Sequence, residues 1–115
     1  MPTVFISNMS KDHDYTKAAI FGVVRPITSG NYPIFKTGRL AEEIIDALSQ
    51  SGEDDYLLLS GSSVVAGLCM AIWLTKHKKV NLLLHDRRQG AYVPRSLIRD
   101  ELRLDIERAH DKATT

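Results

Sequence analysis

The feature that most constrains the fold is a run of 20 uncharged residues, Tyr56 to Thr75, broken near its start by Ser60-Gly61-Ser62-Ser63. Before the break, Tyr56–Ser60 is almost continuously apolar rather than alternating, and Val80–His85 repeats that pattern. Apolar residues on both faces of a strand indicate that both faces are covered, as in a parallel sheet. Between them a helix is expected at Val64–His77, apolar nearly all round until Lys76 and therefore largely buried. Because the break leaves no uninterrupted apolar span of about 20 residues, we expect no membrane segment.

The rest of the chain alternates between strand and helix signals. Further strands are expected at Thr3–Ser7, Val23–Thr28 and Ala91–Arg95, and helices at Thr16–Phe21, Thr37–Ser51 and Leu97–His110. We expect Gly52 to end the second of these helices in a left-handed conformation, and Ser96 to cap the start of the last one. Pro26 and Pro94 each remove a ladder donor, so their strands should lie at sheet edges.

These elements predict a single α/β domain over residues 1–115. The expected architecture is a three-layer Rossmann-like sandwich with a mostly parallel sheet and one antiparallel edge hairpin, because alternating strands and helices form crossover units. The single cysteine, Cys69, excludes an internal disulfide. The N-terminal sequence has no secretory pattern, so we expect a cytoplasmic protein, in the host cytoplasm if the protein is viral.

The net charge of +1 hides a segregation of charge along the chain. Residues 40–56 carry a net charge of −6, whereas residues 76–99 carry +6. Such asymmetry is typical of a protein with an anionic partner, but two oppositely charged faces of one domain would produce it as well.

Three strings carry a family resemblance: Asp55-Tyr-Leu-Leu-Leu-Ser-Gly-Ser62, Val80-Asn-Leu-Leu-Leu-His-Asp86 and Tyr92-Val-Pro-Arg95. They resemble small uncharacterised bacteriophage accessory proteins, over about residues 4–98. The resemblance implies a viral accessory protein, and a role against host defence would fit it. It supplies no activity and no site residues.

The best candidate site is the break itself, Ser60, Gly61, Ser62 and Ser63, which joins a buried strand to a buried helix. The first N–H groups of a helix have no internal partners and attract anions. Asn8, His85 and Arg88 follow or end neighbouring strands, and the carboxyl ends of parallel strands share one edge where ligands bind. We therefore expect a non-catalytic module that binds a phosphate-bearing small molecule, such as a nucleotide, or a host protein. The alternative is a tight turn with an ordinary helix cap.

Two other classes of function stay open. The first is an enzyme that degrades a nucleotide or cyclic oligonucleotide signal, with His85 as general acid or base. The second is a single-stranded nucleic-acid-binding protein that uses the basic hairpin 85–95, whose contact residues would be Arg87, Arg88, Tyr92 and Arg95. We expect no metal site at Asp12-His13-Asp14, because a second group of ligands is missing, and no other cofactor. A homo-oligomer, such as a homodimer, is expected, with Met70 and Trp73 either in the core or at a subunit contact.

Overall fold

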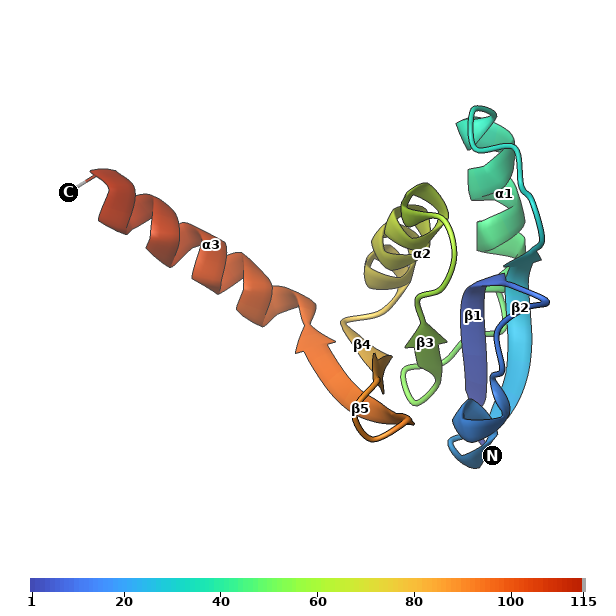
Figure 1. Ribbon diagram of the computed structural model, residues 1–115. Coiled ribbons are helices and arrows are strands. Elements are labelled where there is room, and N and C mark those ends of the chain that lie inside the picture. Colours follow the sequence, from blue (N-terminus) through green and yellow to red (C-terminus); the bar gives the residue numbers. More distant parts are fainter. Residues whose placement is uncertain (115) are drawn as a thin grey trace.

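A computed structural model describes residues 1–114 and shows a five-stranded mixed sheet in the order β2-β1-β3-β4-β5 (Figure 1). All neighbouring strands are parallel except β4 and β5, which form an antiparallel pair. This confirms the predicted α/β fold, and Pro26 and Pro94 do lie on the two edge strands. The elements in chain order are β1 (Thr3–Met9), the 3₁₀ helix η1 (Thr16–Ile20), β2 (Val23–Ser29), α1 (Thr37–Ala47), β3 (Tyr56–Leu58), α2 (Ser63–Lys76), β4 (Lys79–Asp86), β5 (Ala91–Ile98) and α3 (Arg99–Thr114).

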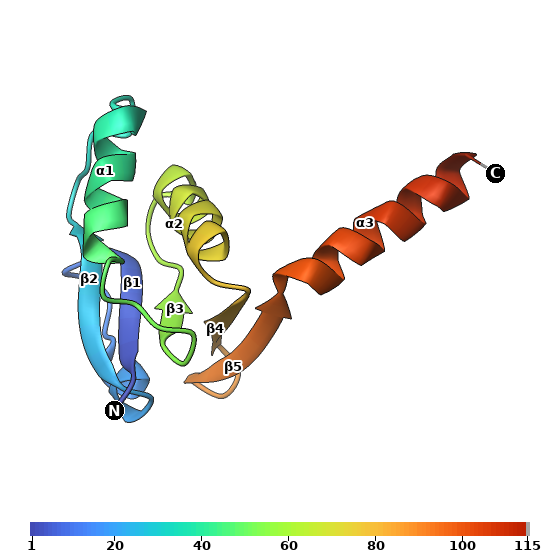
Figure 2. The same cartoon turned by 180° about the vertical axis from the view of Figure 1, so that it is seen from behind.

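Helices α1 and α2 lie side by side over one face of the sheet (Figures 1 and 2). The apolar stripe of α1 buries Leu40 and Ile44 in this layer, Leu48 directly after the helix joins them, and α2 contributes Trp73. The ring of Trp73 packs edge-on against Phe5 of β1 at a centroid distance of 5.9 Å. This layer contains most of the apolar core, so it fixes where α2 begins above the sheet.

The other face of the sheet is covered by η1 and the residue before it, not by an α-helix. Tyr15 and Ala18 pack there against Val4, Ile6 and Leu58. The expected helix at Thr16–Phe21 is thus present in a shorter, tighter form, since 3₁₀ turns serve as short connectors. The segment brings Tyr15 and its neighbours close to the carboxyl ends of the strands.

Strand β5 is longer than expected, and this corrects the predicted start of the last helix. Its pairing with β4 runs on to Lys79↔Ile98, so Ser96 is a strand residue that bonds Asn81 and does not cap a helix. Helix α3 begins at Arg99 and projects away from the sheet beyond β5 (Figures 1 and 2). Within residues 1–114, no helix combines the length and apolarity required to cross a bilayer.

The end of α1 also differs from the sequence expectation. The helix stops at Ala47, and Gly52 is not among the glycines with positive φ. The ammonium of Lys76, from the end of α2, donates to the carbonyls of Leu48 and Ser49 at 2.6 and 2.8 Å. A cation at these carbonyls complements the helix dipole, and the Leu48 carbonyl also accepts from the N–H and hydroxyl of Ser51. Ser51 and the distant Lys76 together thus perform the role that we assigned to Gly52.

Candidate binding site at the β1/β3 switch point

The chain changes direction between β1 and β3. From β1 it crosses to β2 on one side, and from β2 it crosses back over β1 to β3 on the other side. At such a point the two crossovers diverge and leave a crevice outside the carboxyl ends of the strands, where open α/β sheets bind their ligands. Asn8 stands at the end of β1 and the turn of residues 60–62 follows β3. The topology therefore brings two of the sequence-predicted segments to one crevice.

Buried Ser7 fixes the turn after β3. Regular pairing of β1 with β3 ends at Ile6↔Leu58. Beyond that pair, the Ser7 hydroxyl donates to the carbonyl of Ser60 and accepts from its N–H, both at 2.7 Å. The Ser60 hydroxyl in turn bonds the hydroxyl of Tyr15 at 2.9 Å. The polar groups of Ser60 are thus bonded within the protein, and its side chain links the turn to Tyr15.

Both the backbone conformation at position 61 and the neighbouring side chain of Asn8 require a glycine there. Its φ is +81°, in the left-handed region that favours glycine. A Cβ placed there would come within 2.7–2.8 Å of the Asn8 side chain. The Asn8 amide donates to the carbonyl of Gly30 at 3.1 Å and accepts from the Thr28 hydroxyl at 2.9 Å. Asn8 therefore links the ends of β1 and β2 while it packs on the turn after β3.

The start of α2 has the geometry expected of a capped helix. Ser62 is the N-cap, and its hydroxyl accepts from the N–H of Val64 at 3.2 Å. Ser63 is the first helical residue and is exposed. The hydroxyl of Ser62 thus satisfies one of the unpaired N–H groups, while the others that every helix start carries remain directed outward.

A hollow of about 520 Å³ lies at this edge, between the loops that follow β1, β2 and β3. The residues that line it are Asn8, Ser10, Lys11, Asp12, Gly30, Asn31 and Gly61. Its volume is that of a small-molecule site, and its lining is polar, with the ammonium of Lys11 as its cation. The sequence interpretation included Asn8 and Gly61 but missed Lys11, Gly30 and Asn31. The position of Gly30 and Asn31 just after the second parallel strand was the signal that could have found them.

His85 lies in a ring cluster on the η1 side of the sheet. Its imidazole is 5.9 Å from that of His13 and 5.1 Å from the ring of Tyr92, centroid to centroid. His13 Nε2 bonds the hydroxyl of Tyr92 at 2.8 Å, and its ring lies 4.6 Å from that of Tyr15. Because Tyr15 bonds Ser60, this cluster adjoins the switch-point turn. The structure thus connects His85 to the turn through residues that sequence reasoning did not assign to a site.

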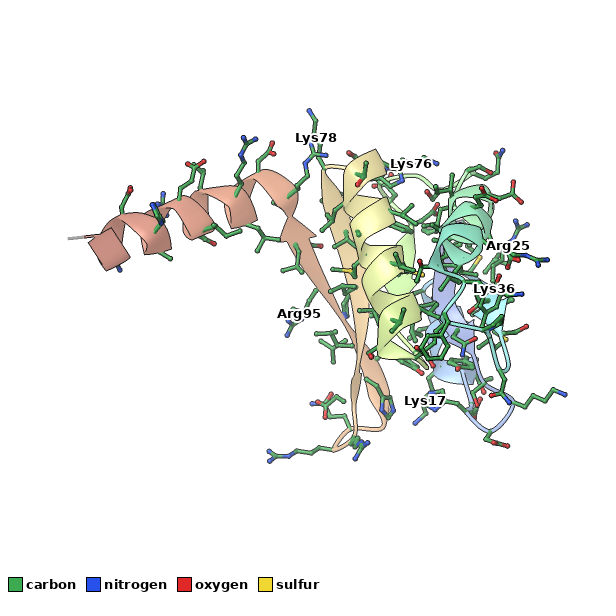
Figure 3. All side chains as sticks on the ribbon, turned by 90° about the horizontal axis from the view of Figure 1, so that it is seen from above. Lys17, Arg25, Lys36, Lys76, Lys78 and Arg95 are labelled. Atoms are coloured by element: carbon green, nitrogen blue, oxygen red, sulfur yellow. The ribbon has the colours of Figure 1, made fainter. Side chains whose placement is uncertain are left out.

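The basic residues do not form one surface. Arg87, Arg88 and Arg95 border a hollow of about 480 Å³ at the turn end of the β4–β5 hairpin. Lys76 and Lys78 lie together at the opposite end of that hairpin (Figure 3). An eight-residue strand spans about 26 Å, so the positive segment of the sequence is divided between two ends of the molecule.

Tyr92 does not have the exposure that base stacking requires. Its side chain is only 7% exposed, and its hydroxyl is engaged by His13. Burial is also the main cause that raises the pKa of Tyr92. The hairpin therefore offers arginines to a nucleic acid without the expected aromatic platform. Arg88 borders the hollow at the hairpin turn and not the one at the switch point.

In the part of the chain that the structure describes, no group of three or more His, Cys, Asp or Glu side chains could hold a metal ion. Asp14, one of the three residues considered as ligands, accepts from the N–H and hydroxyl of Thr16. These bonds lower the pKa of the Asp14 carboxyl. Asp86 accepts from the N–H of Arg88 at 3.0 Å, so it stabilises the hairpin turn.

Residues 2–98 match a protein-family model described as Phage Pam3 gp32-like protein. The match includes the whole sheet, the switch-point turn and the ring cluster, and it ends where α3 begins. A search of curated proteins and a search of solved structures each gave no match.

Proposed function

The chain belongs to the Phage Pam3 gp32-like protein family, and from this starting point we propose that it is a non-catalytic module that binds a phosphate-bearing small molecule at the β1/β3 switch point. The observation that carries the proposal is the coincidence of three features at one edge. The strand order changes direction there, the N-terminus of α2 points there, and a polar hollow with Lys11 at its rim opens there.

In this proposal the contacts come from backbone groups and from Lys11. The hydroxyls of Ser60 and Ser62 are already bonded within the protein. A phosphate would instead accept from N–H groups at the start of α2, where the helix dipole adds a partial positive charge. Lys11 would supply the full charge, and Asn31 a polar contact to the rest of the ligand. A nucleotide fits this division, because a hollow of about 520 Å³ exceeds what a bare phosphate fills.

Calorimetric titration with inorganic phosphate, mononucleotides and cyclic dinucleotides tests the proposal. We expect Lys11→Gln to weaken binding of the ligand that the unmodified protein prefers by about tenfold, the loss of one charge-assisted bond. The matched control is Lys78→Gln, at the other end of the sheet (Figure 3), which should leave affinity unchanged. Gly61→Val should abolish binding, because its side chain would displace Asn8 from the crevice. Absence of binding to every one of these compounds would reject the site and direct the search to a host protein partner.

The ring cluster supports a second proposal, an enzyme that acts on a nucleotide or a cyclic oligonucleotide. Two exposed imidazoles, His13 and His85, lie side by side next to the switch-point turn. One neutral and one protonated imidazole can act as base and acid in the same reaction. Incubation of each nucleotide with the metal-free protein, followed by chromatography of the products, tests this proposal. Turnover that His85→Ala removes would support it, and unchanged nucleotides would exclude it without affecting the binding proposal.

A further inference from the structure

Helix α3 has almost no contact with the rest of its own chain. From Asp100 to Lys112 every residue is exposed, and the helix stands clear of the sheet in all three views (Figures 1, 2 and 3). Its anchor is at its first residue, where Arg99 donates to the carbonyl of Leu74 at 2.9 Å. An isolated helix of this length is marginal in water, because tertiary packing provides most helical stability. The helix therefore needs a surface to pack on.

The size of the molecule shows how much surface is left uncovered. The chain exposes 7727 Å², whereas a compact monomer of 12.9 kDa exposes about 6,300 Å². The radius of gyration is 15.3 Å against about 13.3 Å for a compact domain of this length. The surplus of about 1,400 Å² is larger than the roughly 800 Å² that each partner contributes to a stable interface.

The exposed side of α3 has the pattern of a protein interface. Ile98, Leu102 and Ile106 are spaced four residues apart and are 42%, 37% and 71% exposed. Residues four apart lie on one face of a helix, so Leu102 and Ile106 form one stripe along α3, and Ile98 is exposed at the end of β5 just before the helix begins. The charged residues of the helix are of both signs, five acidic and four basic between Arg99 and Lys112. A nearly neutral helix of mixed charge suits a nearly neutral partner, such as this chain itself, better than a polyanion.

The same chain carries a second uncovered apolar surface on α2. This helix is apolar nearly all round, a property of helices that are buried on all sides. Val65, Cys69 and Trp73 face the core, but Val64, Gly67 and Ala71 are exposed. A Cβ on Gly67 would meet nothing within 4 Å, so this side is uncovered in the chain. Helices α2 and α3 are of similar length, 14 and 16 residues.

We propose that the protein is a two-fold symmetric dimer in which the α3 arm of each copy packs its apolar stripe on the outer face of the partner's α2. An isologous interface of this kind uses both uncovered surfaces twice and leaves neither exposed. The interface covers the apolar stripe of α3, and the charged side chains of α3 remain at the rim of the interface. The arrangement leaves the hollow at the switch point open, because residues of neither helix line it.

Light scattering on a sizing column tests the dimer with the full chain at about 1–100 µM, the range for interfaces of moderate affinity. We expect a dimer of the unmodified protein, and a dimer dissociation constant raised at least about tenfold by Leu102→Glu combined with Ile106→Glu. Leu104→Glu is the matched control, because Leu104 is also exposed but lies on the opposite side of α3. Circular dichroism checks that each variant is folded.

The α2 side of the interface has its own variants. Ala71→Glu and Val64→Glu should disrupt the dimer as strongly as the arm variant does, whereas Ala19→Glu, on exposed η1, should not. A monomeric unmodified protein at the highest concentration would overturn the proposal. Dissociation by the arm variant, with both α2 variants still dimeric, would also overturn it, since the two arms would then pack on each other.

Discussion

Replacing Gly61 by alanine measures how tightly the switch-point turn is packed. Two costs add at this position. A non-glycine residue at φ +81° pays about 1–2 kcal/mol for the left-handed conformation. The new Cβ, 2.7 Å from the Asn8 amide nitrogen, must also displace that side chain. Displacement breaks the two hydrogen bonds of Asn8, each with a net contribution of about 0.5–1.5 kcal/mol. We therefore expect Gly61→Ala to reduce the free energy of unfolding by about 2–5 kcal/mol.

Gly30 offers a matched control for the conformational part of this cost. Its φ is +68°, and a Cβ there would meet nothing within 4 Å. Gly30→Ala should therefore cost only about 1–2 kcal/mol. The effect of alanine on the entropy of the unfolded chain is the same at both positions and cancels in the difference. The excess cost at Gly61, about 1–3 kcal/mol, isolates the contact with Asn8.

Urea titration at one fixed protein concentration supplies the free energies. The fluorescence of Trp73, fully buried and the only tryptophan, reports unfolding. A double-mutant cycle completes the experiment: in an Asn8→Gly background, Gly61→Ala should cost no more than Gly30→Ala does, because the colliding side chain is gone. Equal losses for Gly61→Ala and Gly30→Ala in the unmodified background would refute the packing argument and leave backbone strain as the only role of Gly61.

Other substitutions test the capping, titration and reactivity that the structure predicts. Ser62→Ala removes the N-cap of α2 and should cost about 1 kcal/mol in urea titration, whereas Ser63→Ala should cost less than half of that. Burial, and next Lys76, lower the pKa of His77, so the unfolded chain takes up a proton first as the pH falls. The contribution of neutral His77 to stability is thus complete above about pH 7 and decreases on acidification. His77→Gln should therefore make the melting temperature less dependent on pH between about pH 7 and 5, and an unchanged dependence would contradict this. Burial raises the pKa of Cys69 to about 12, so a disulfide reagent at pH 8 should modify the native protein only at its rate of unfolding; rapid native labelling would disprove the burial.

The strand assignments could be predicted because they depend on local sequence. Continuous apolarity marks β3 and β4 as buried strands, and Pro26 and Pro94 can lie only at edges, where the structure has them. The element ends could not be predicted in the same way. The carbonyls after the end of α1 are bonded partly by Lys76, which is almost thirty residues away in the chain. The end of β5 depends on the full length of β4, because the antiparallel ladder continues as long as both strands have partners.

Only those residues of the candidate site that lie at the ends of predicted strands could be predicted from the sequence. Asn8 and Gly61 follow from the rule that parallel strands share their carboxyl edge, and the structure places them in contact. The positions of His13 and Tyr15 depend on η1 folding back over the sheet, for which the sequence holds no periodic signal. The arginines of the hairpin were grouped by their proximity in sequence. The length of the β4–β5 ladder separates them from the lysines at its other end, and the burial of Tyr92 removes the expected stacking partner.

The hydrogen bonds at the switch point show which side chains hold the turn in place, which the residue types alone did not reveal. A serine-rich turn suggests hydroxyls that bind a ligand, yet the hydroxyl of Ser7 closes the β1–β3 pair, that of Ser60 braces Tyr15, and that of Ser62 caps α2. Each of these bonds satisfies a group that would otherwise be costly to bury or leave unpaired. In the proposed site, a phosphate would therefore use mainly the outward N–H groups at the start of α2 and the charge of Lys11. Loss of a serine in this turn should therefore act first on folding, and loss of Lys11 on affinity.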